Sequence, residues 1–255
     1  MIAFTRPPSA ALTECELTFL AREPIDVSIA LQQHRAYEAA LRKAGARIER
    51  LPDVTDLPDA PFVEDTAVVL DEVAIIASMA AASRRREIET VVPALGAERP
   101  LKRLSPPAFL DGGDVLRVGR ELFIGVTTRT NHEAVRAVAG IVREHGYTVT
   151  PVEVTGCLHL KTGCSALNDR TVLIDSRRVP RETFRHLSCV DVPEGEPDAA
   201  NVLVIDGVAV MPSGCPHTLA LLLEQGLSVE PVDLSEFQKA EAGATCLSLI
   251  VPSLR

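Results

Sequence analysis

The sequence predicts an α/β propeller, a ring of similar units that each contain a β-hairpin, a helix and a third strand. A hairpin pattern recurs along the chain, and the recurrences begin near residues 62, 109, 159, 199 and 243. Repeats spaced by roughly 40–50 residues are typical of an array or a propeller. The last repeat has no room for its helix. A strand at 1–6 and a helix at Asp26–Ala44 would complete this repeat by closing the ring.

The second unit shows the pattern most clearly. Apolar strands at 115–118 and 121–125 flank a Gly-Arg turn, which is a hairpin signal. A helical pattern follows over 131–145, and Gly146 is its expected C-cap. Residues 147–152 again have the pattern of a strand. The expected order within a unit is therefore strand, strand, helix, strand.

The other units repeat this template with shorter signals. Their expected strands lie at 66–70 and 73–76, after Gly163 and at 171–174, at 202–205 and 208–211, and at 247–251. Helices are expected near 84–96 and over 217–225.

Composition places the chain among globular proteins and gives no sign of a domain boundary. The 255 residues are 46 % hydrophobic and 24 % charged, without a linker or a low-complexity stretch. We therefore expect one domain over residues 1–255, large enough to bury a core without disulfides.

Charge and cysteine usage argue against several classes of protein. The net charge of −9 and the pI near 5.2 disfavour nucleic-acid binding, which needs a basic face. No apolar run predicts a membrane helix, and the N-terminus lacks a secretory signal pattern. The six scattered cysteines favour reduced thiols in the cytoplasm over disulfides or a zinc ribbon. We expect a cytoplasmic monomer or homodimer.

Polar residues stand just before the first strand of each unit. Closure of the ring would bring these clusters to one end of a central axis, although they are distant in sequence. One pocket would then collect carboxylates, a histidine and a cysteine, namely Glu64 and Asp65, Asp111 and Asp114, His159 and Lys161, Asn201, and Cys246.

The charged residues in these clusters suit a zwitterionic ligand. Glu64 and Asp65 are flanked by apolar residues and are costly to bury without a cation. A guanidinium matches carboxylates, and a metal is the competing cation, although no zinc-type His or Cys spacing is present. Arg84 and Arg129 stand at expected helix starts, against the dipole preference, which suggests anion binding.

Cys246 and His159 form a candidate nucleophile and proton shuttle. A free cysteine is more often a small buried hydrophobe, and a lone histidine is more often a core residue. The pair is more informative, because a nucleophilic cysteine needs both a thiolate and a proton acceptor. We place His159 on a strand, facing away from Leu158 and Leu160.

Six motifs in order give the chain a resemblance to a known family. They are Phe-Val-Glu-Asp (62–65), Ser-Arg-Arg (83–85), Leu-Asp-Gly-Gly-Asp (110–114), Arg-Thr-Asn (129–131), Leu-His-Leu-Lys (158–161) and the cysteine before the last strand. Together they resemble the dimethylarginine dimethylaminohydrolases, over essentially the whole chain. The resemblance implies the five-bladed α/β propeller of the guanidine-modifying enzymes, the pentein fold, with ββαβ repeats around a central active site.

The resemblance also implies catalytic roles. Cys246 would attack the guanidinium carbon of an Nω-methylated arginine and form a thiouronium intermediate. His159 would protonate the leaving amine and then activate water, with Asp111 orienting it. Asp65, with Glu64 beside it, would hold the guanidinium nitrogens. The products would be citrulline and dimethylamine or methylamine, with no cofactor and no metal.

The ligand implied is a small guanidinium amino acid. The resemblance assigns its amino-acid end to Asp59, Arg84 and Arg129 and to backbone groups near Leu17 and Ala240. Residues from about 17 to 25 would form a mobile lid over the site.

One stretch departs from the family, and other functions remain open. Residues 78–82 read Ser-Met-Ala-Ala-Ala where the family has Thr-Arg-Pro-Gly, which bears on the identity of the substrate. An arginine deiminase, or a hydrolase of another N-substituted guanidine or ureido compound, would use the same catalytic set. An amidinotransferase is a weaker alternative. A non-catalytic binding protein on this fold would have no reason to keep Cys246, His159 and the carboxylates together.

Overall fold

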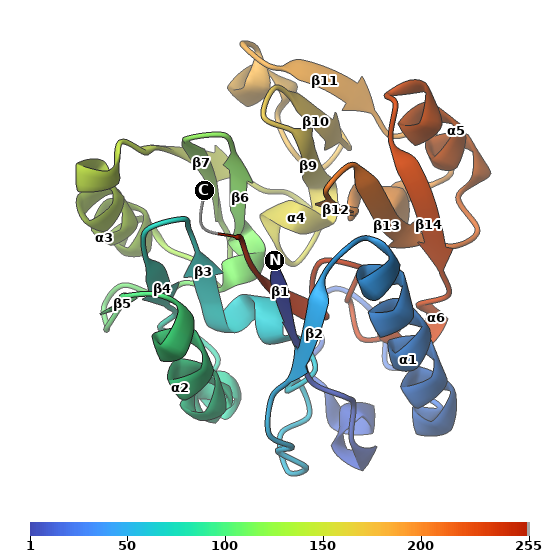
Figure 1. The fold of residues 1–255 in the computed structure, drawn as a ribbon, viewed down its shortest axis with the longest axis horizontal. Coiled ribbons are helices and arrows are strands. Elements are labelled where there is room, and N and C mark those ends of the chain that lie inside the picture. Colours follow the sequence, from blue (N-terminus) through green and yellow to red (C-terminus); the bar gives the residue numbers. More distant parts are fainter. Residues whose placement is uncertain (254–255) are drawn as a thin grey trace.

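Five three-stranded sheets surround a central axis in the computed structural model, which describes residues 1–253 (Figure 1). In every sheet an inner strand pairs antiparallel with a middle strand, which pairs parallel with an outer strand. The predicted propeller is confirmed. The sheets, from inner to outer strand, are β3 (Ala67–Val69), β4 (Ala74–Ile76) and β5 (Leu101–Arg103); β6 (Val115–Val118), β7 (Glu121–Val126) and β8 (Thr148–Glu153); β9 (Cys164–Asn168), β10 (Thr171–Ile174) and β11 (Ser188–Asp191); β12 (Leu203–Ile205), β13 (Val208–Pro212) and β14 (Ser228–Val232); and β15 (Ser248–Val251), β1 (Ile2–Thr5) and β2 (Arg47–Arg50).

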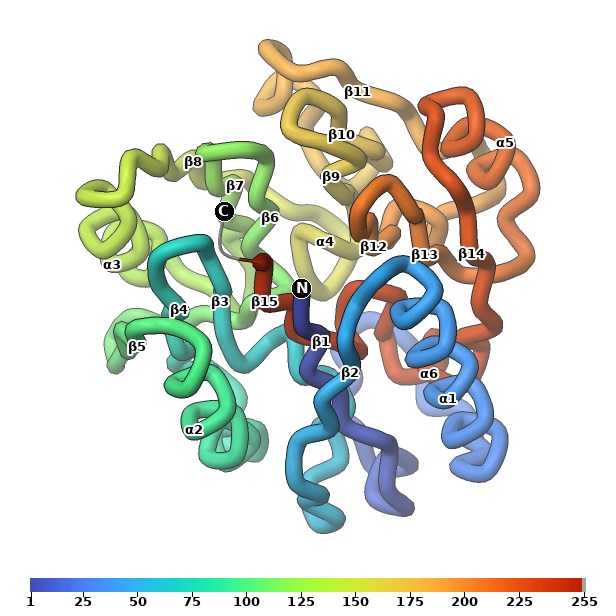
Figure 2. Tube along the Cα trace, in the orientation of Figure 1, coloured from blue at the N-terminus to red at the C-terminus, as the bar shows by residue number. Residues whose placement is uncertain are grey.

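The fifth sheet closes the ring with strands from both ends of the chain, as expected. Strand β15 pairs antiparallel with β1, with Val251 opposite Ile2, and β1 pairs parallel with β2. Figure 2 shows β1 and β15 side by side near the axis.

Helices link the middle strand to the outer strand in four of the five units. Parallel neighbours need such a crossover, because a tight turn cannot join them. These helices are α1 (Val27–Lys43), α2 (Ile88–Glu98), α3 (His132–Val142) and α5 (Pro216–Glu224), and they lie on the outside of the ring (Figure 1). The side chain of Asp26 accepts N–H bonds at the start of α1, and that of Asn131 does so at the start of α3. The 3₁₀ turn η5 (Arg143–His145) continues α3, and Gly146 ends it with a φ of 76°, as predicted.

Two connections differ from the expected pattern of a unit. The helix expected near 84–96 begins only at Ile88, because residues 82–87 form 3₁₀ turns that bury Arg84 and Glu87. The connection from β10 to β11 contains a 3₁₀ turn, Arg181–Phe184, in place of an α-helix. This connection is short and contains Pro180, which cannot donate a helical hydrogen bond.

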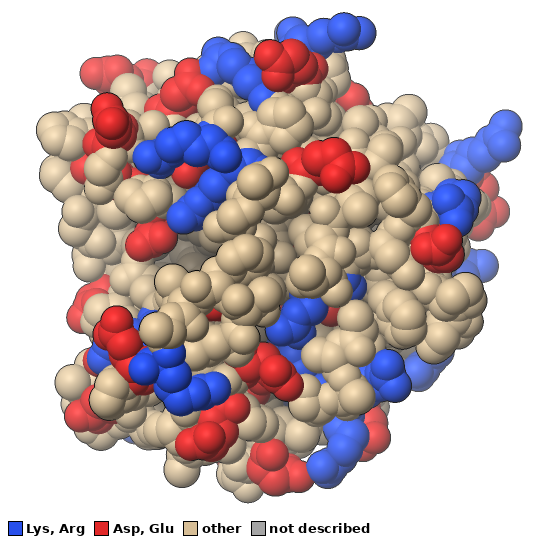
Figure 3. All heavy atoms as spheres, turned by 180° about the vertical axis from the view of Figure 1, so that it is seen from behind, with Lys and Arg blue, Asp and Glu red and all other residues tan. Residues whose placement is uncertain are grey.

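Figure 3 shows the molecule from the side opposite to that of Figure 1. Acidic and basic side chains are interspersed over that side. Within residues 1–253, no helix has the length and apolar character needed to cross a bilayer.

The turns that precede the inner strands pack together at one end of the axis. They include η2 (Val63–Thr66), η4 (Gly112–Asp114) and the single helical turn α4 (Leu160–Gly163), and η4 contacts both of the others. Their backbones approach so closely that a Cβ on Gly112 would lie 2.1 Å from the carbonyl oxygen of Glu64. Glycine is therefore required at this crossing.

We expect Gly112→Ala to lower the free energy of unfolding by about 3 kcal/mol or more, because the new methyl group has no room beside a rigid backbone. Gly140→Ala on α3 is the matched control, since a Cβ there meets nothing within 4 Å. It should stabilise the protein by about 0.5–1 kcal/mol through helix propensity. Urea unfolding of both variants measures the difference, and equal stabilities would refute the packing argument.

Candidate active site

Most of the predicted catalytic residues come from these turns. Asp65 lies in η2, Asp111 is the N-cap of η4, and His159 is the N-cap of α4. The prediction that His159 lies on a strand is wrong, because the chain after it forms a helical turn. Asp114 explains this turn, since its Oδ1 accepts the Leu160 N–H at 2.9 Å.

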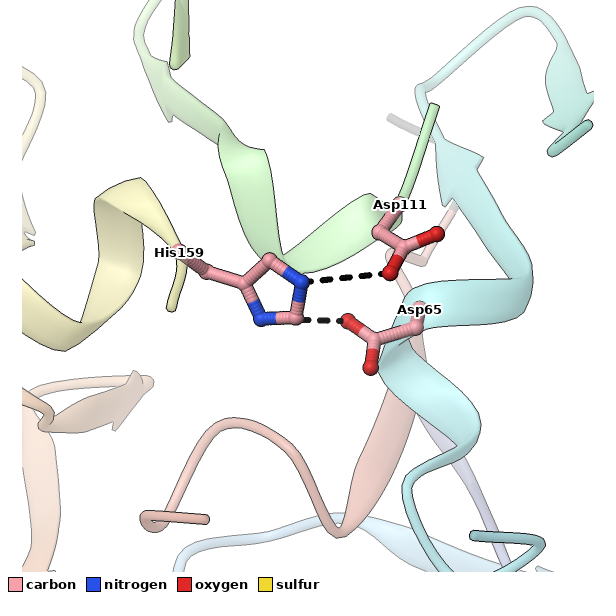
Figure 4. Close-up of side chains that lie close together, drawn as sticks. All are labelled: Asp65, Asp111 and His159. Atoms are coloured by element: carbon pink, nitrogen blue, oxygen red, sulfur yellow. Dashed lines mark hydrogen bonds and ion pairs between the residues drawn. The ribbon is translucent and has the colours of Figure 1, made fainter. Parts of the chain in front are cut away.

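The ring of His159 faces two carboxylates, those of Asp111 and Asp65 (Figure 4). Its Nε2 is 3.2 Å from Oδ2 of Asp111, and its Nδ1 is 3.8 Å from Oδ1 of Asp65. All three side chains are buried. Burial alone would lower the pKa of His159, but Asp65, Asp114 and Asp111 outweigh it and raise the pKa to about 9. His159 is therefore an imidazolium at neutral pH, able to donate a proton.

Arg84 supplies a second cation to the same cluster. Its Nη1 donates to Oδ2 of Asp65 at 2.8 Å and lies 3.9 Å from Oδ2 of Asp111. Its Nε and Nη2 donate to the two oxygens of Glu87 at 3.0 and 2.9 Å, a bidentate pair. Burial opposes the charge on Asp65, but His159 and Arg84 outweigh it and lower the pKa of Asp65 to about 2.

These contacts change the interpretation of Arg84. The sequence led us to expect it at the amino-acid end of the ligand, whereas here it is 3 % exposed and its nitrogens are bonded to protein carboxylates. Sequence analysis missed Glu87. Its spacing of three residues from Arg84 is the only signal, and surface helices often carry such pairs.

Glu64 also has partners that the sequence did not indicate. Its Oε1 accepts from Nζ of Lys161 at 2.6 Å, and its Oε2 accepts from the Thr245 hydroxyl at 2.6 Å. Asn201 joins the same layer by donating to Thr245 Oγ1 and accepting its backbone N–H. Both oxygens of Glu64 are engaged, as are both oxygens of Asp65, and the expected contact of Glu64 with the guanidinium stays a prediction. A cavity of about 220 Å³ lies against this layer, lined by residues of the inner strands.

A backbone hydrogen bond connects Cys246 to the cluster. The Glu64 N–H donates to the Cys246 carbonyl at 3.3 Å. This bond places residues 243–246, here called the thiol loop, beside η2. The Gly243 N–H lies 3.4 Å from Sγ. Burial, together with the carboxylates of Glu64 and Asp65, raises the pKa of the Cys246 thiol to about 12. Without a ligand, Cys246 is therefore a protonated thiol that remains partly exposed.

The residues expected at the amino-acid end lie around the start of the 17–25 segment. Asp59 is buried and accepts the Glu16 N–H on both oxygens, at 3.3 and 3.2 Å. Burial raises the pKa of Asp59, although Arg84 and Arg129 oppose this. Arg129 is buried too, and its Nη1 has no hydrogen-bond partner within the described part of the chain.

The two backbone contacts expected there lie on one apolar cluster. Ala240 belongs to its buried core, and Leu17 packs against that core from the 17–25 segment.

The arrangement favours covalent chemistry on a cation. It offers a thiol, an imidazolium and buried carboxylates at one end of the axis. Asp65, Asp111 and His159 have ligand atoms within 4.8 Å of one another, close enough for a metal ion. Arg84 already provides positive charge at this position, so the carboxylates do not need a metal to be buried.

We expect the charge on His159 to make stability depend on pH. The folded protein holds this proton up to about pH 9, whereas an unfolded histidine loses it near 6.5. The stabilisation is complete below pH 6.5 and is lost as the pH rises through 9. The free energy of unfolding should fall by about 2 kcal/mol between pH 7.5 and 10, and this fall should be absent in His159→Gln. Denaturant unfolding at a series of pH values measures this dependence. If the free energy of unfolding falls equally with pH in the two proteins, the assignment is contradicted.

Comparison with known proteins agrees with this geometry. The sequence model of the family described as "N,N dimethylarginine dimethylhydrolase, eukaryotic" matches residues 16–181. The chain is 34 % identical to the N(G),N(G)-dimethylarginine dimethylaminohydrolase of Pseudomonas aeruginosa over 226 residues, covering 88 % of this chain and 89 % of the relative. It is 36 % identical to the enzyme of that name from Streptomyces coelicolor over 251 residues, covering 97 % and 95 %.

A solved structure of a cysteine-to-serine mutant of the Pseudomonas aeruginosa protein, complexed with citrulline, superposes with a TM-score of 0.92 at 32 % identity, covering 97 % of each chain. Family model, relatives and fold thus agree over most of the sequence. The chain belongs to the dimethylarginine dimethylaminohydrolase family.

Proposed function

We propose that this protein hydrolyses Nω-methylated arginine to citrulline and methylamine or dimethylamine, with Cys246 as the nucleophile. The observation that carries the proposal is the position of the His159 imidazolium, between Asp111 and Asp65, at the end of the axis where Cys246 lies. The names of the family and of its relatives support the reaction.

Asp65 is the carboxylate best placed to receive the guanidinium. It is buried and ionised, and both of its oxygens are fixed, Oδ1 by the Gly113 N–H at 3.0 Å and Oδ2 by Arg84 at 2.8 Å. A guanidinium is a poor electrophile, because its charge is delocalised. A rigid carboxylate localises that charge and holds the carbon near the sulfur.

The first half-reaction forms the covalent intermediate. The charge of the bound guanidinium favours the Cys246 thiolate, and the thiol proton passes to solvent. The thiolate attacks the central carbon and forms a C–S bond. His159 then donates its proton to the methylated nitrogen, the C–N bond breaks, and the amine leaves. Nε2 of His159 faces Asp111, so Nδ1, which is not hydrogen-bonded to Asp65 at 3.8 Å, is the nitrogen available for this transfer.

The second half-reaction consumes water. Neutral His159 takes a proton from a water molecule, whose oxygen attacks the thiouronium carbon. The C–S bond breaks, the departing sulfur takes up the remaining hydroxyl proton as the Cys246 thiol re-forms, and the ureido group of citrulline remains. Water is the only second substrate, and the steps require no cofactor.

We assign the amino-acid end of the ligand to Arg129, Asp59 and the backbone near Leu17 and Ala240. Arg129 is the buried cation with an unpartnered nitrogen, so it suits a carboxylate. Asp59 and the backbone near Leu17 and Ala240 suit the ammonium group. We also propose a cytoplasmic location, because all six cysteines are free thiols, Cys246 among them.

The decisive measurement is citrulline release from asymmetric dimethylarginine, monomethylarginine and arginine. We expect turnover of the methylated forms, and a loss of roughly three orders of magnitude or more in Cys246→Ser. Cys215→Ser is the control, since this thiol lies outside the site as the N-cap of α5. Preferred turnover of arginine would favour a deiminase. A folded protein that turns over none of the three would point to another guanidine or ureido substrate and to the residues at 78–82.

Labelling with iodoacetamide tests whether the substrate's charge assists thiolate formation. The free enzyme should label slowly at neutral pH, because the pKa of Cys246 is raised to about 12. A bound, non-reacting guanidinium amino acid should lower the apparent pKa of the Cys246 thiol, read from the labelling rate, by one unit or more. At a fixed pH the labelling should then be about tenfold faster. An unchanged apparent pKa would rule out substrate assistance, while leaving the citrulline assay to decide the reaction.

A further inference from the structure

We propose that Glu241 is a positioning residue that holds the 17–25 segment over the amino-acid end of the site, a role that rests on the function proposed above. Its Oε1 accepts three consecutive backbone N–H groups, those of Thr18, Phe19 and Leu20, at 2.9, 2.5 and 2.6 Å. Successive N–H groups that converge in this way form an anion-binding nest, and a carboxylate in it makes charge-assisted bonds.

Apolar burial does not hold the tip of the segment. The side chains of Phe19 and Leu20 are 49 % and 51 % exposed. A cavity of about 170 Å³ lies beneath them, and its lining includes Glu241 and Gly243 of the thiol loop. Because the tip covers a hollow rather than a packed core, lifting it costs little apolar contact. The carboxylate is therefore the main contact that fixes it.

Other contacts secure the two ends of the segment instead of its tip. The Glu16 N–H donates to Asp59 before the segment begins. Nζ of Lys239 donates to the carbonyl of Pro24 at 3.0 Å near its end. Arg22 of the segment donates to the carbonyls of Thr13 and Cys15 at 2.6 Å each. These contacts hold the segment on either side of its tip, and Glu241 holds residues 18–20 between them.

The position of Glu241 in the chain links two parts of the pocket wall. Glu241 directly follows Ala240, and the N–H groups that it binds directly follow Leu17. Those two residues carry the backbone groups expected to contact the ligand. Glu241 has a φ of 58°, which residues other than glycine rarely adopt, so the chain tolerates strain at this point. One carboxylate therefore sets the distance between the two backbone contacts.

Loss of this carboxylate should weaken binding more than chemistry. An untethered tip no longer positions Leu17, while Cys246, His159 and Asp111 keep their contacts. We expect KM for the amino-acid substrate to rise by roughly tenfold in Glu241→Ala, with kcat changed by much less, since hydrogen bonds to charged groups are worth about that factor.

Hydrogen exchange read by mass spectrometry tests the tether without relying on activity. In Glu241→Ala the amides of residues 18–20 should exchange roughly tenfold to a hundredfold faster than in the unaltered protein. Glu241→Gln keeps an acceptor oxygen without the charge and should lie between the two. Glu14→Ala removes an exposed carboxylate from the nearby η1 turn (Ala10–Glu14) and should leave the exchange unchanged.

The outcomes separate the tether from the proposed reaction. Faster exchange at 18–20 with a raised KM supports the positioning role. Unchanged exchange at 18–20, or a fall in kcat at constant KM, overturns it. If the unaltered protein hydrolyses no methylated arginine, the proposed function fails on its own, and the exchange rates still decide whether Glu241 holds the segment.

Discussion

The burial of several carboxylates at one end of the axis is the constraint on which the site depends. Each carboxylate is costly to remove from water unless a cation or a set of N–H donors accompanies it. Arg84 pairs with Asp65 and Glu87, Lys161 pairs with Glu64, and His159 pairs with Asp111 and again with Asp65. The pairs made by Lys161 and His159 join turns from different blades, so the ring must close before these charges are compensated. The electrostatics of the site therefore depend on the closed topology of the fold.

Much of the fold was predictable because its signals are local. Hairpin turns, caps such as Asn131 and Gly146, and the spacing of the repeats all act within a few residues. The errors arise where a distant partner overrides a local pattern. His159 alternates with Leu158 and Leu160, which favours a strand, but Asp114 of another blade accepts the Leu160 N–H and the chain turns. Arg84 and Glu87 likewise favour 3₁₀ turns over a helix, because both must reach the buried cluster.

The candidate site was predictable in membership more than in pairing. Symmetry alone indicates that Asp65, Asp111, His159 and Cys246 share one end of the axis, because each precedes an inner strand. It cannot indicate which carboxylate meets which cation, since pairing depends on side-chain geometry across blades. Glu64 illustrates the limit. It neighbours Asp65 in sequence, yet it points into a separate layer with Lys161 and Thr245.

The balance of charge also explains why a cationic substrate would bind and a neutral product would leave. Five buried carboxyl groups meet three cations in this cluster, the acids being Glu64, Asp65, Glu87, Asp111 and Asp114 and the cations Arg84, His159 and Lys161. Burial reduces the excess of negative charge, because it raises the pKa of Glu87 to about 7 and that of Asp114 to about 6. Burial, together with the carboxylates of Glu64 and Asp65, also keeps the Cys246 thiol protonated. A guanidinium supplies the missing charge, so its binding and the ionisation of Cys246 favour each other. The ureido group of citrulline is uncharged, so it lacks the electrostatic attraction to the carboxylates that the guanidinium has. Completion of the reaction therefore favours release of the product.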